Sequence, residues 1–499
     1  MNSAEPKTIT PTNDDVCEDV ADGVPSEPPQ PLYSILSEKE KIFTVCTCSM
    51  VTFLAPVAAN MYFPALGPLA RDMHVSSSKI SLTITSFKIV QGVAPVLTAS
   101  FSDQNGRRPV LLASVLIFIG SNIGLALQSS YAALLVLRCF QALGSSNISL
   151  ISSASVADVV PRAERGRYMF YSSLGMTIGP AIGPTLGGIL TQFLGWRSIF
   201  WFLCISSGVM FCVIMLFLRE TCRAIVGNGS VSPQPWNRCA LQFLHQDSQQ
   251  VPDYETRVIT RRRPGILATL GILLDRHISL LVLCNALCFC GTSAILSSLP
   301  VLLERKYRLN PLQIGLCYLP HTAGGILARW NVGTLVDRNF KRHAHKIGEK
   351  LRSNQQTQGQ LRRMPLEKVR LELALPFLYL SCLCVIGYSW IMYYDVHLAG
   401  PLVLLFLFGN ATTGVNNSIT TLAIDLNAYR PAAAMAAMNT VKHLTAAGAV
   451  AAVVPLIDAI GIGWVGTFLA GLWFLASPAL WILYWKGQRW RQMETSEQD

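Results

Sequence analysis

Long apolar runs alternate with short polar or charged breaks along most of the chain. A run of about 20 apolar residues crosses about 30 Å of hydrocarbon as a helix. Such a run has to be helical, because backbone groups in lipid must pair within their own segment. Charged residues, Pro and Gly divide the chain into twelve runs, at 43–68, 80–101, 109–128, 131–158, 166–191, 197–218, 277–302, 312–336, 372–393, 398–423, 432–457 and 463–485. The pattern predicts an all-α membrane protein with twelve transmembrane helices.

The composition agrees with this pattern and excludes several classes of protein. Hydrophobic residues make up 51% of the chain and charged residues only 14%, whereas soluble domains carry about 25% charged residues. A soluble enzyme or a disulfide-rich secreted module is therefore not expected. The 14 Cys residues are scattered through the apolar runs, with no His at metal-ligand spacing, so we expect no metal site and no cofactor.

The distribution of charge sets the expected topology. Cytoplasmic loops of membrane proteins carry an excess of Lys and Arg, and most of the 40 basic residues lie on one side if both termini are cytoplasmic. The net charge of +11 therefore reflects topology, and we expect no nucleic-acid partner. The predicted domains are a disordered cytoplasmic tail (1–42), an N-terminal six-helix bundle (43–218), a cytoplasmic linker (219–276), a C-terminal six-helix bundle (277–485, with a cytoplasmic loop at 337–371) and a second tail (486–499).

Two loops show an internal repeat. Asp103 follows the second span and is followed in turn by Gly106, Arg107 and Arg108; Asp337 and Arg338 follow the eighth span, with a basic pair at the same offset as the first. Each loop follows the second span of a six-span half, which indicates duplication. Two parallel six-helix repeats are expected to enclose a site near the bilayer midplane.

The fifth span is rich in Gly and Pro. Gly175, Gly179, Gly183 and Gly187 recur every four residues and form one smooth stripe that permits close helix approach. Pro180 and Pro184 each remove a backbone hydrogen bond, and Gly188 completes the pattern. We expect a helix shaped to slide or rock against a partner; a static packing face is the alternative.

Together these segments resemble the major facilitator superfamily, specifically its twelve-span drug:proton antiporter branch. Asp103 with Gly106, Arg107 and Arg108 matches the family's loop motif, Arg138-Cys-Phe-Gln141 matches its span-four motif, and Gly179 to Gly188 matches its span-five antiporter motif. The stretches 195–201 and 219–230 look like fungal members. In the second loop copy, Phe340 replaces the turn glycine.

The resemblance implies alternating access, with export driven by proton entry. It also implies a cytoplasmic gate formed by the two loops, at Asp103, Gly106, Arg107, Arg108, Asp337 and Arg338, and a link between Arg138 and proton coupling. Further candidates for the proton carrier are Asp158, Asp425, His321 and His443. The imidazole of His titrates near neutral pH, which suits it to this role.

Four basic residues fall inside the spans, at Lys88, Arg138, Arg329 and Lys442, and no Asp or Glu lies at these depths. An ionisable group inside a span is costly and marks a functional site by default. We expect these residues to line a substrate cavity together with polar neighbours, namely Gln91, Gln141, Asn285, His321, Asn410 and Asn416. Such a cavity favours anionic substrates, such as organic acids or acidic secondary metabolites.

Several alternatives stay open. A broad-specificity multidrug exporter of lipophilic compounds, an uncoupled facilitator and a transporter-like sensor all fit the span pattern. No HExxH, GxSxG or Walker A sequence is present, so neither an enzyme nor an ATP-driven pump is expected. We expect a monomer in the lipid bilayer of the plasma membrane, with the vacuolar membrane as the lesser possibility.

Overall fold

The structure is a computed structural model of the chain. It describes residues 34–160, 165–229, 231, 233–240, 271–347, 365–394, 396–427 and 431–496. Within these residues the chain is almost entirely helical and contains no strand.

Twelve of the described helices have at least 21 residues. They are α1 (Glu38–Asn60), α3 (Ser77–Asn105), α4 (Arg107–Leu127), α5 (Tyr131–Val159), α6 (Arg165–Leu194), α7 (Arg197–Phe217), α11 (Arg276–Tyr307), α13 (Leu319–Ile347), α15 (Leu366–Tyr393), α16 (Ala399–Leu426), α17 (Pro431–Ile460) and α18 (Ile462–Ser496). The short helices α2 (Leu66–Asp72), α8 (Arg223–Val226) and α12 (Pro311–Leu316) lie between them, as do the 3-10 turns η1 (Phe63–Ala65), η2 (Pro235–Asn237) and η3 (Ile272–Leu274).

Each of the twelve predicted spans overlaps one long helix, and the first and eighth spans also include short helices, since 43–68 runs into η1 and α2 and 312–336 begins in α12. Ten candidate spans among the described residues are long and apolar enough to cross a membrane, and α6 and α13 are not among them. The sequence of α13 includes Arg329 near its middle and a run of basic residues from Arg338 to Lys346, which lowers its hydropathy.

Some helix ends differ from the prediction. The helix α13 continues through Phe340 to Ile347, so the first part of the expected loop at 337–371 is helical. Likewise α1 begins at Glu38 and α18 reaches Ser496, inside the expected tails. Apolar length marks where hydrocarbon ends, but a helix can extend into water wherever its residues still favour it. The loss of the turn glycine at Phe340 explains why α13 does not stop there.

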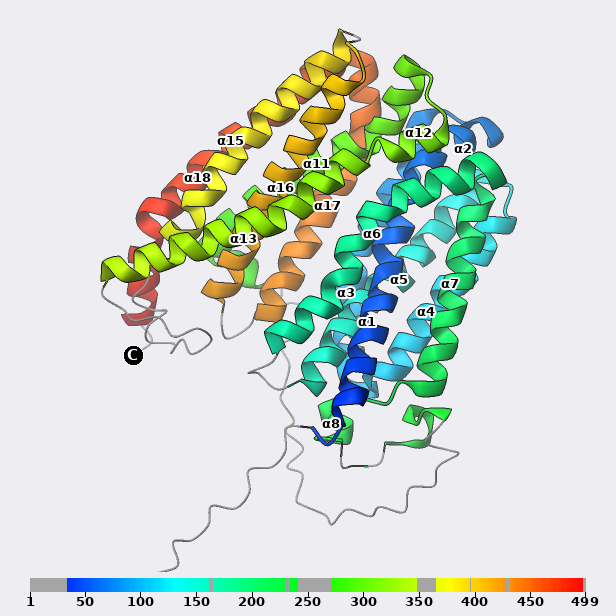
Figure 1. Cartoon of the computed structure of the whole chain (residues 1–499), viewed down its shortest axis with the longest axis vertical. Coiled ribbons are helices and arrows are strands. Elements are labelled where there is room, and N and C mark those ends of the chain that lie inside the picture. Colours follow the sequence, from blue (N-terminus) through cyan, green and yellow to red (C-terminus); the bar gives the residue numbers. More distant parts are fainter. Residues whose placement is uncertain are drawn as a thin grey trace, which may run out of the picture.

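The long helices form two groups that lie side by side (Figure 1). Helices α1 and α3 to α7 pack with one another, and α11, α13 and α15 to α18 form the second group. Below, these groups are the N-terminal and C-terminal halves. We call the end of the molecule where α1 begins and α18 ends the terminal end, and the other the opposite end.

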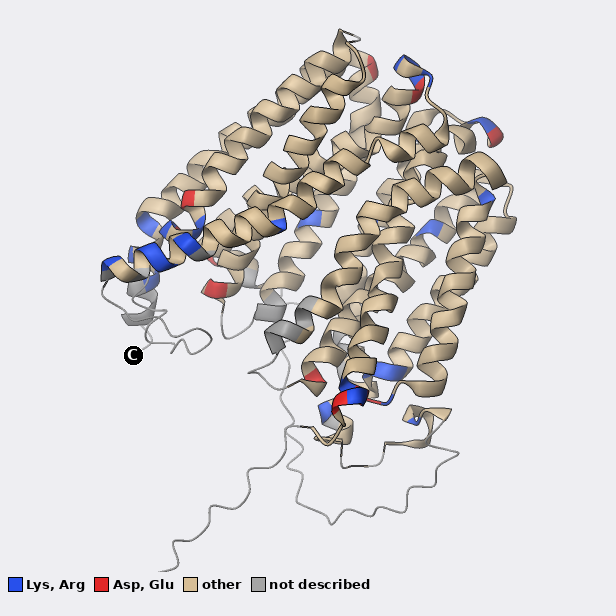
Figure 2. Cartoon of the chain, viewed as in Figure 1, with Lys and Arg blue, Asp and Glu red and all other residues tan. Residues whose placement is uncertain are grey.

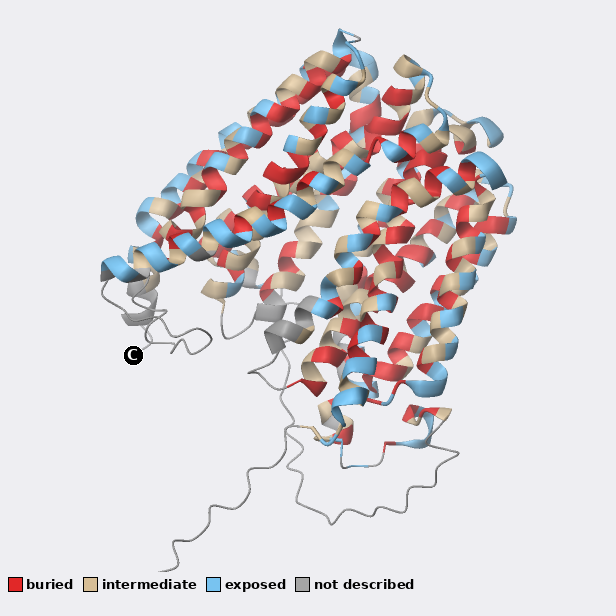
Figure 3. Ribbon diagram, viewed as in Figure 1, coloured by how far each residue is buried: buried red, intermediate tan, exposed pale blue. Residues whose placement is uncertain are grey.

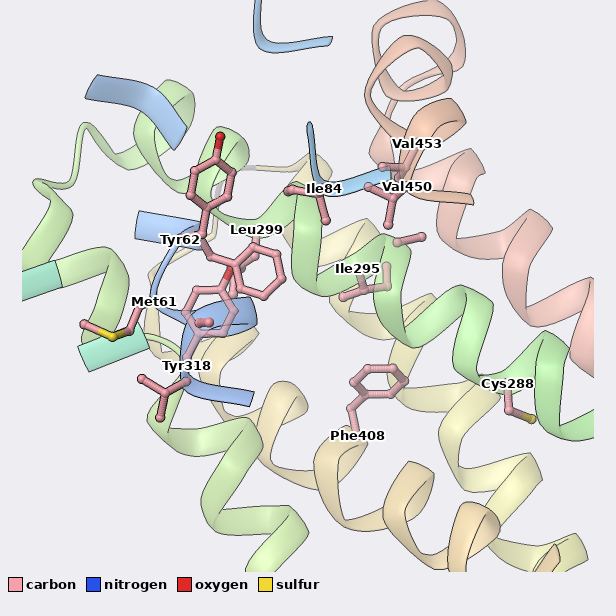
Figure 4. Close-up of a cluster of buried hydrophobic side chains, with 14 of the residues drawn as sticks. Met61, Tyr62, Ile84, Cys288, Ile295, Leu299, Tyr318, Phe408, Val450 and Val453 are labelled. Atoms are coloured by element: carbon pink, nitrogen blue, oxygen red, sulfur yellow. The ribbon is translucent and has the colours of Figure 1, made fainter. Parts of the chain in front are cut away.

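The two halves meet along two seams. One joins α3 to α17, and the other joins α6 to α12 and α13, while α2 and η1 also reach α11 and α12 near the opposite end. In Figure 1 the two groups lie closest at that end and diverge toward the terminal end. Figure 4 shows Ile84 of α3 beside Val450 and Val453 of α17, a contact within the main apolar core.

The outer faces of the helices are apolar and exposed. Large side chains such as Phe140, Leu383 and Phe468 are at least half exposed, and Figure 3 shows exposed residues along the outer faces of the helices. Lys, Arg, Asp and Glu gather at the two ends, and only isolated basic segments interrupt the middle (Figure 2). Such an apolar band between two charged rims is the surface that a bilayer requires.

The glycine stripe of α6 packs within the N-terminal half. A Cβ at Gly175, Gly179, Gly183 or Gly187 would meet atoms of α1 or of the turn after it. Only Gly188 reaches the other half, where a Cβ would meet the backbone of α12. The four-residue stripe therefore packs closely against α1, and whether α6 slides against that helix stays a prediction.

Candidate functional site

Arg138 lies in the interior of the N-terminal half, two turns from the start of α5 at Tyr131. Its side chain is 1% exposed, and its guanidinium lies 4.1 Å from the ring centroid of Tyr62 and 4.4 Å from that of Phe87. Two aromatic faces around one guanidinium stabilise the charge through the ring quadrupoles. Three segments of one half, the turn after α1 together with α3 and α5, thus surround this cation.

Arg138 also belongs to a buried hydrogen-bond chain. Its Nη1 donates to Oε1 of Gln141 at 2.5 Å, and Nε2 of Gln141 donates to Oδ1 of Asn122 at 2.7 Å. Nδ2 of Asn122 donates to the backbone oxygen of Phe118, which fixes the far end on α4. The described part of the chain places no carboxylate in ion-pair contact with Arg138, and the contacts that it does give the guanidinium are the two rings and the amide of Gln141.

Lys88 and Lys442 come together from opposite halves. Nζ of Lys88 on α3 lies 5.2 Å from the ring centroid of Phe289, and Nζ of Lys442 on α17 lies 4.9 Å from the same centroid. Both lysines are half-buried. Two like charges beside one ring repel each other, and the described salt bridges include neither of them.

The backbones around this pair are in close contact. Oγ1 of Thr440 donates to the backbone oxygen of Gly92 at 3.0 Å, a hydrogen bond between the two halves. A Cβ at Gly92 would lie 3.1 Å from Cβ of His443, so a larger residue would force α3 and α17 apart. The imidazole of His443 also contacts Phe289, edge to face, with ring centroids 5.3 Å apart.

Two further predicted polar residues lie on helices of the C-terminal half. Asn285, one turn before Phe289 on α11, donates from Nδ2 to Oγ1 of Thr420 at 3.4 Å. Its Oδ1 and that of Asn416 are buried without a hydrogen-bond partner in the described structure.

The remaining predicted cavity residues are not brought to this pair by any described contact. Nδ2 of Asn410 donates to the backbone oxygen of Gly324, which joins α16 to α13. The ring of His321 packs at 5.7 Å from that of Phe408. Arg329 is exposed and Gln91 half-buried. No described contact joins Arg329 to the lysine pair, and its place in the cavity stays a prediction.

At the terminal end of the N-terminal half, Glu220 binds the backbone of the predicted gate loop. Its carboxylate accepts hydrogen bonds from the backbone N–H groups of Arg107 and Arg108, at 2.9 and 3.1 Å, and from those of Thr221 and Cys222. Four N–H donors and the start of a helix stabilise a carboxylate that is only 6% exposed. Gly106 has φ +106°, and a Cβ there would meet the Glu220 carboxylate.

Both basic residues of this loop make side-chain hydrogen bonds within the N-terminal half. Nε of Arg107 donates to Asp158 at 3.0 Å, and Nη2 of Arg108 donates to the backbone oxygen of Met215 at 2.7 Å. The side chain of Asp103 lies outside the described residues. The loop is thus fixed to α5 and α7 of its own half.

The C-terminal half contains an ion pair equivalent to Arg107–Asp158, but its Arg does not come from the loop that repeats the gate motif. Asp425 at the end of α16 pairs with Arg370 of α15 at 3.1 Å, as Asp158 at the end of α5 pairs with Arg107 of α4. The basic residues after Asp337 do not take this role, because they lie on the continuing helix α13. Arg338 is exposed, and the side chain of Asp337 lies outside the described residues.

The opposite end carries contacts between the halves. Arg71 of α2 forms an ion pair with Glu304 of α11. The rings of Phe63 and Tyr318 stack, with centroids 5.6 Å apart and planes at 4°. These contacts hold the halves together at the end where Figure 1 shows them closest.

The sequence did not predict a role for Phe289, for Glu220 or for the rings of Tyr62 and Phe87 around Arg138. An apolar residue in an apolar run carries no distinguishing pattern, so Phe289, Tyr62 and Phe87 could not be singled out. Glu220 had a signal that could have been used, because it is an acid directly after an apolar span.

The comparisons with known proteins agree with this architecture. The family model described as Major Facilitator Superfamily matches residues 48–452. The chain belongs to the major facilitator superfamily. It is therefore an integral membrane protein of a family of transporters, with twelve transmembrane helices in two six-helix bundles, as predicted.

Similar curated proteins include several fungal transporters. This transporter is 43% identical to MFS-type transporter clz19 of Cochliobolus lunatus, over 94% of this chain and 89% of the relative. It is 43% identical to MFS-type transporter R5 of Phoma sp., over 93% and 88%. Multidrug transporter QDR2 of Candida glabrata is 32% identical, over 92% and 82%. These relatives confirm the resemblance found in the sequence.

A solved structure shares the fold. The crystal structure of the human organic anion transporter MFSD10 (TETRAN) matches with a TM-score of 0.53 and covers 89% of this chain and 100% of its own. At 18% identity this likeness supports the fold alone.

Proposed function

We propose that this transporter exports small organic anions, such as organic acids or acidic secondary metabolites, by alternating access. The observation that carries the proposal is the meeting of Lys88 and Lys442 at the seam between the halves. Burial of an ammonium group is unfavourable unless an opposite charge or a polar partner compensates. An anion bound between the two lysines supplies that compensation and removes their mutual repulsion.

The position of this pair links binding to movement. Lys88 belongs to the N-terminal half, whereas Lys442 and Phe289 belong to the C-terminal half. Rocking of the halves changes the separation of the two ammonium groups, so an anion favours the arrangement in which it can contact both. Arg138 is a further buried cation, and its described contacts are all within the N-terminal half.

A broad multidrug exporter of lipophilic compounds is the second candidate function. Its support is the relative from Candida glabrata, which is named a multidrug transporter. Recognition of lipophilic cations calls for an acidic group in the membrane interior. Among the described residues, the acids of the predicted sites, Asp158 and Asp425, lie at helix ends and pair with Arg, which favours the anionic class.

Proton exchange is the coupling mode that we propose, and an uncoupled facilitator is its alternative. Asp158 and Asp425 are equivalent candidates for the proton carrier in the two halves. Protonation of either carboxylate would release its Arg partner at the terminal end. His443 at the lysine pair and His321 are the other candidates within the helices, together with Arg138. Equal flux in vesicles with and without a pH gradient would exclude antiport.

For the setting of the protein we propose a monomer in the plasma membrane with both termini cytoplasmic. The excess of Lys and Arg at the terminal end supports this orientation. Cysteine labelling from outside intact cells tests it: a Cys at His74, between α2 and α3, should react, and one at Arg338 should not.

The function is tested in proteoliposomes with purified protein. Uptake of a membrane-impermeant dicarboxylate and of a permanently cationic dye is compared for the wild type and for Lys88→Gln and Lys442→Gln. We expect uptake of the dicarboxylate, and its loss in both variants. Uptake of the cation alone, or dicarboxylate uptake unchanged in both variants, would overturn the proposal.

A further inference from the structure

The lysine pair is built around an aromatic ring rather than around a polar group. Each Nζ lies about 5 Å from the centroid of Phe289, so the two ammonium groups are at most about 10 Å apart. A single carboxylate cannot contact both groups at that upper limit, whereas an anion with two acceptor groups can. The Phe289 ring lies next to both of the positions that those acceptor groups would occupy.

Unpartnered polar atoms lie next to the same ring. Nδ1 of His443 and Oδ1 of Asn285 are both buried and have no hydrogen-bond partner among the described residues. Asn285 precedes Phe289 by four residues on α11, so both side chains lie on one face of that helix. The side chain of Asn285 is only 3% exposed, and a buried polar atom without a partner is costly. A ligand that donates or accepts a hydrogen bond here would relieve that cost.

We propose that the site between Lys88 and Lys442 selects planar aromatic anions with at least two polar groups, and that Phe289 is the residue that determines this selectivity. This inference rests on the proposed function. Without a ligand, the ring stabilises both ammonium groups through its quadrupole. When carboxylates arrive, charge-assisted hydrogen bonds replace those weaker contacts, and the ring becomes free to stack on the substrate.

An aliphatic anion gains less binding free energy at the same site. It can neutralise both lysines, but it offers the Phe289 and His443 rings only apolar contact. Aromatic pairs contribute about 0.5–1.5 kcal/mol beyond the area that they bury. That range corresponds to a preference of about 2- to 13-fold for the aromatic anion.

Terephthalate and adipate are suitable probes. Both carry two carboxylates and cross bilayers poorly when ionised, but only terephthalate is planar and aromatic. In proteoliposomes we expect the wild type to show a KM for terephthalate about 2- to 13-fold below that for adipate. In Phe289→Leu the KM for terephthalate should rise by a similar factor, and the KM for adipate should change less than about twofold.

Two variants keep the test independent of folding. Phe289→Tyr retains the ring and should retain the preference for terephthalate. Phe140→Leu, on the exposed face of α5, should behave like the wild type. Equal changes in both KM values in Phe289→Leu, or no change in either, would overturn the selectivity while leaving anion export intact. If the wild type carries neither dicarboxylate, both the proposed function and this inference are wrong.

Discussion

Arg138 and the Lys88–Lys442 pair are basic groups in the membrane interior, but the protein surrounds them in different ways. Arg138 is enclosed by one half, with two rings and a chain of side-chain amides that is fixed to α4. The lysines come from both halves and share one ring, with His443 beside it. The compensation of Arg138 therefore moves with its half, whereas that of the lysines depends on how the halves are placed.

This difference separates two roles for a buried charge. A cation whose partners belong to one rigid body contributes a fixed potential through the transport cycle. A cation pair divided between two bodies has an energy that changes with their movement, and a ligand can bias that change. We therefore expect substitutions at Arg138 to act first on stability and substitutions at the lysines to act first on transport.

The largest expected effect is on anion transport in Lys88→Gln/Lys442→Gln. Loss of charge-assisted contacts costs about 1.5–3 kcal/mol each, so dicarboxylate flux at low concentration should fall by more than tenfold. Thermal stability in detergent should hold or rise, because two mutually repelling, half-buried charges are removed. A variant that unfolds at a clearly lower temperature would contradict the separation of roles.

Charge-conserving exchanges sharpen the contrast. Arg138→Lys replaces a planar group between two rings with a compact ammonium that cannot stack on both. We expect its free energy of unfolding to fall by about 1–2 kcal/mol. In Lys442→Arg the charge stays at the seam, and dicarboxylate flux should remain within about threefold of wild type. Denaturant titration and flux on the same preparations measure both, and equal stability losses in the two variants would refute the distinction.

Glu220 offers a similar contrast at the terminal end. Its carboxylate accepts hydrogen bonds from four backbone N–H groups of its own half. Because Glu220→Gln removes the negative charge from these contacts, the free energy of unfolding should fall by about 1 kcal/mol. Asp458→Asn is a matched control, because Asp458 pairs with Arg305 where both side chains are about half exposed. That variant should change the unfolding midpoint little. A larger loss of unfolding free energy in Asp458→Asn than in Glu220→Gln would contradict a stabilising role for the hydrogen bonds of Glu220.

The smallest effect is expected at Arg71 and Glu304, an ion pair between the halves at the opposite end. Its partners are partly exposed, so water screens the attraction. Arg71→Glu should open that end more often and change flux by a fewfold, and Arg71→Glu/Glu304→Arg should restore it. Labelling of a Cys introduced at Tyr318 reports the opening, and no restoration in the double variant would show that the pair does not couple the halves.

Much of the fold could be predicted from the sequence, because a bilayer imposes a length and an apolar composition on each span. The limits of α13 and α18 could not, since a helix that continues into water leaves no apolar signal. Lys88, Lys442 and Arg138 were found because charge in an apolar run is conspicuous. Phe289 was not, because its importance comes only from the two lysines that meet it in space. Arg329 has the same sequence signal, yet its helix face leaves it exposed.

Charge movement on a supported membrane tests the central claim most directly. Terephthalate applied to proteoliposomes that contain the wild type should produce a transient current with the sign of an entering anion, and the Lys88→Gln/Lys442→Gln variant should produce none. A current of equal size in the double variant would contradict the claim that the two halves share an anion site. So would a wild-type response to a lipophilic cation but not to the anion.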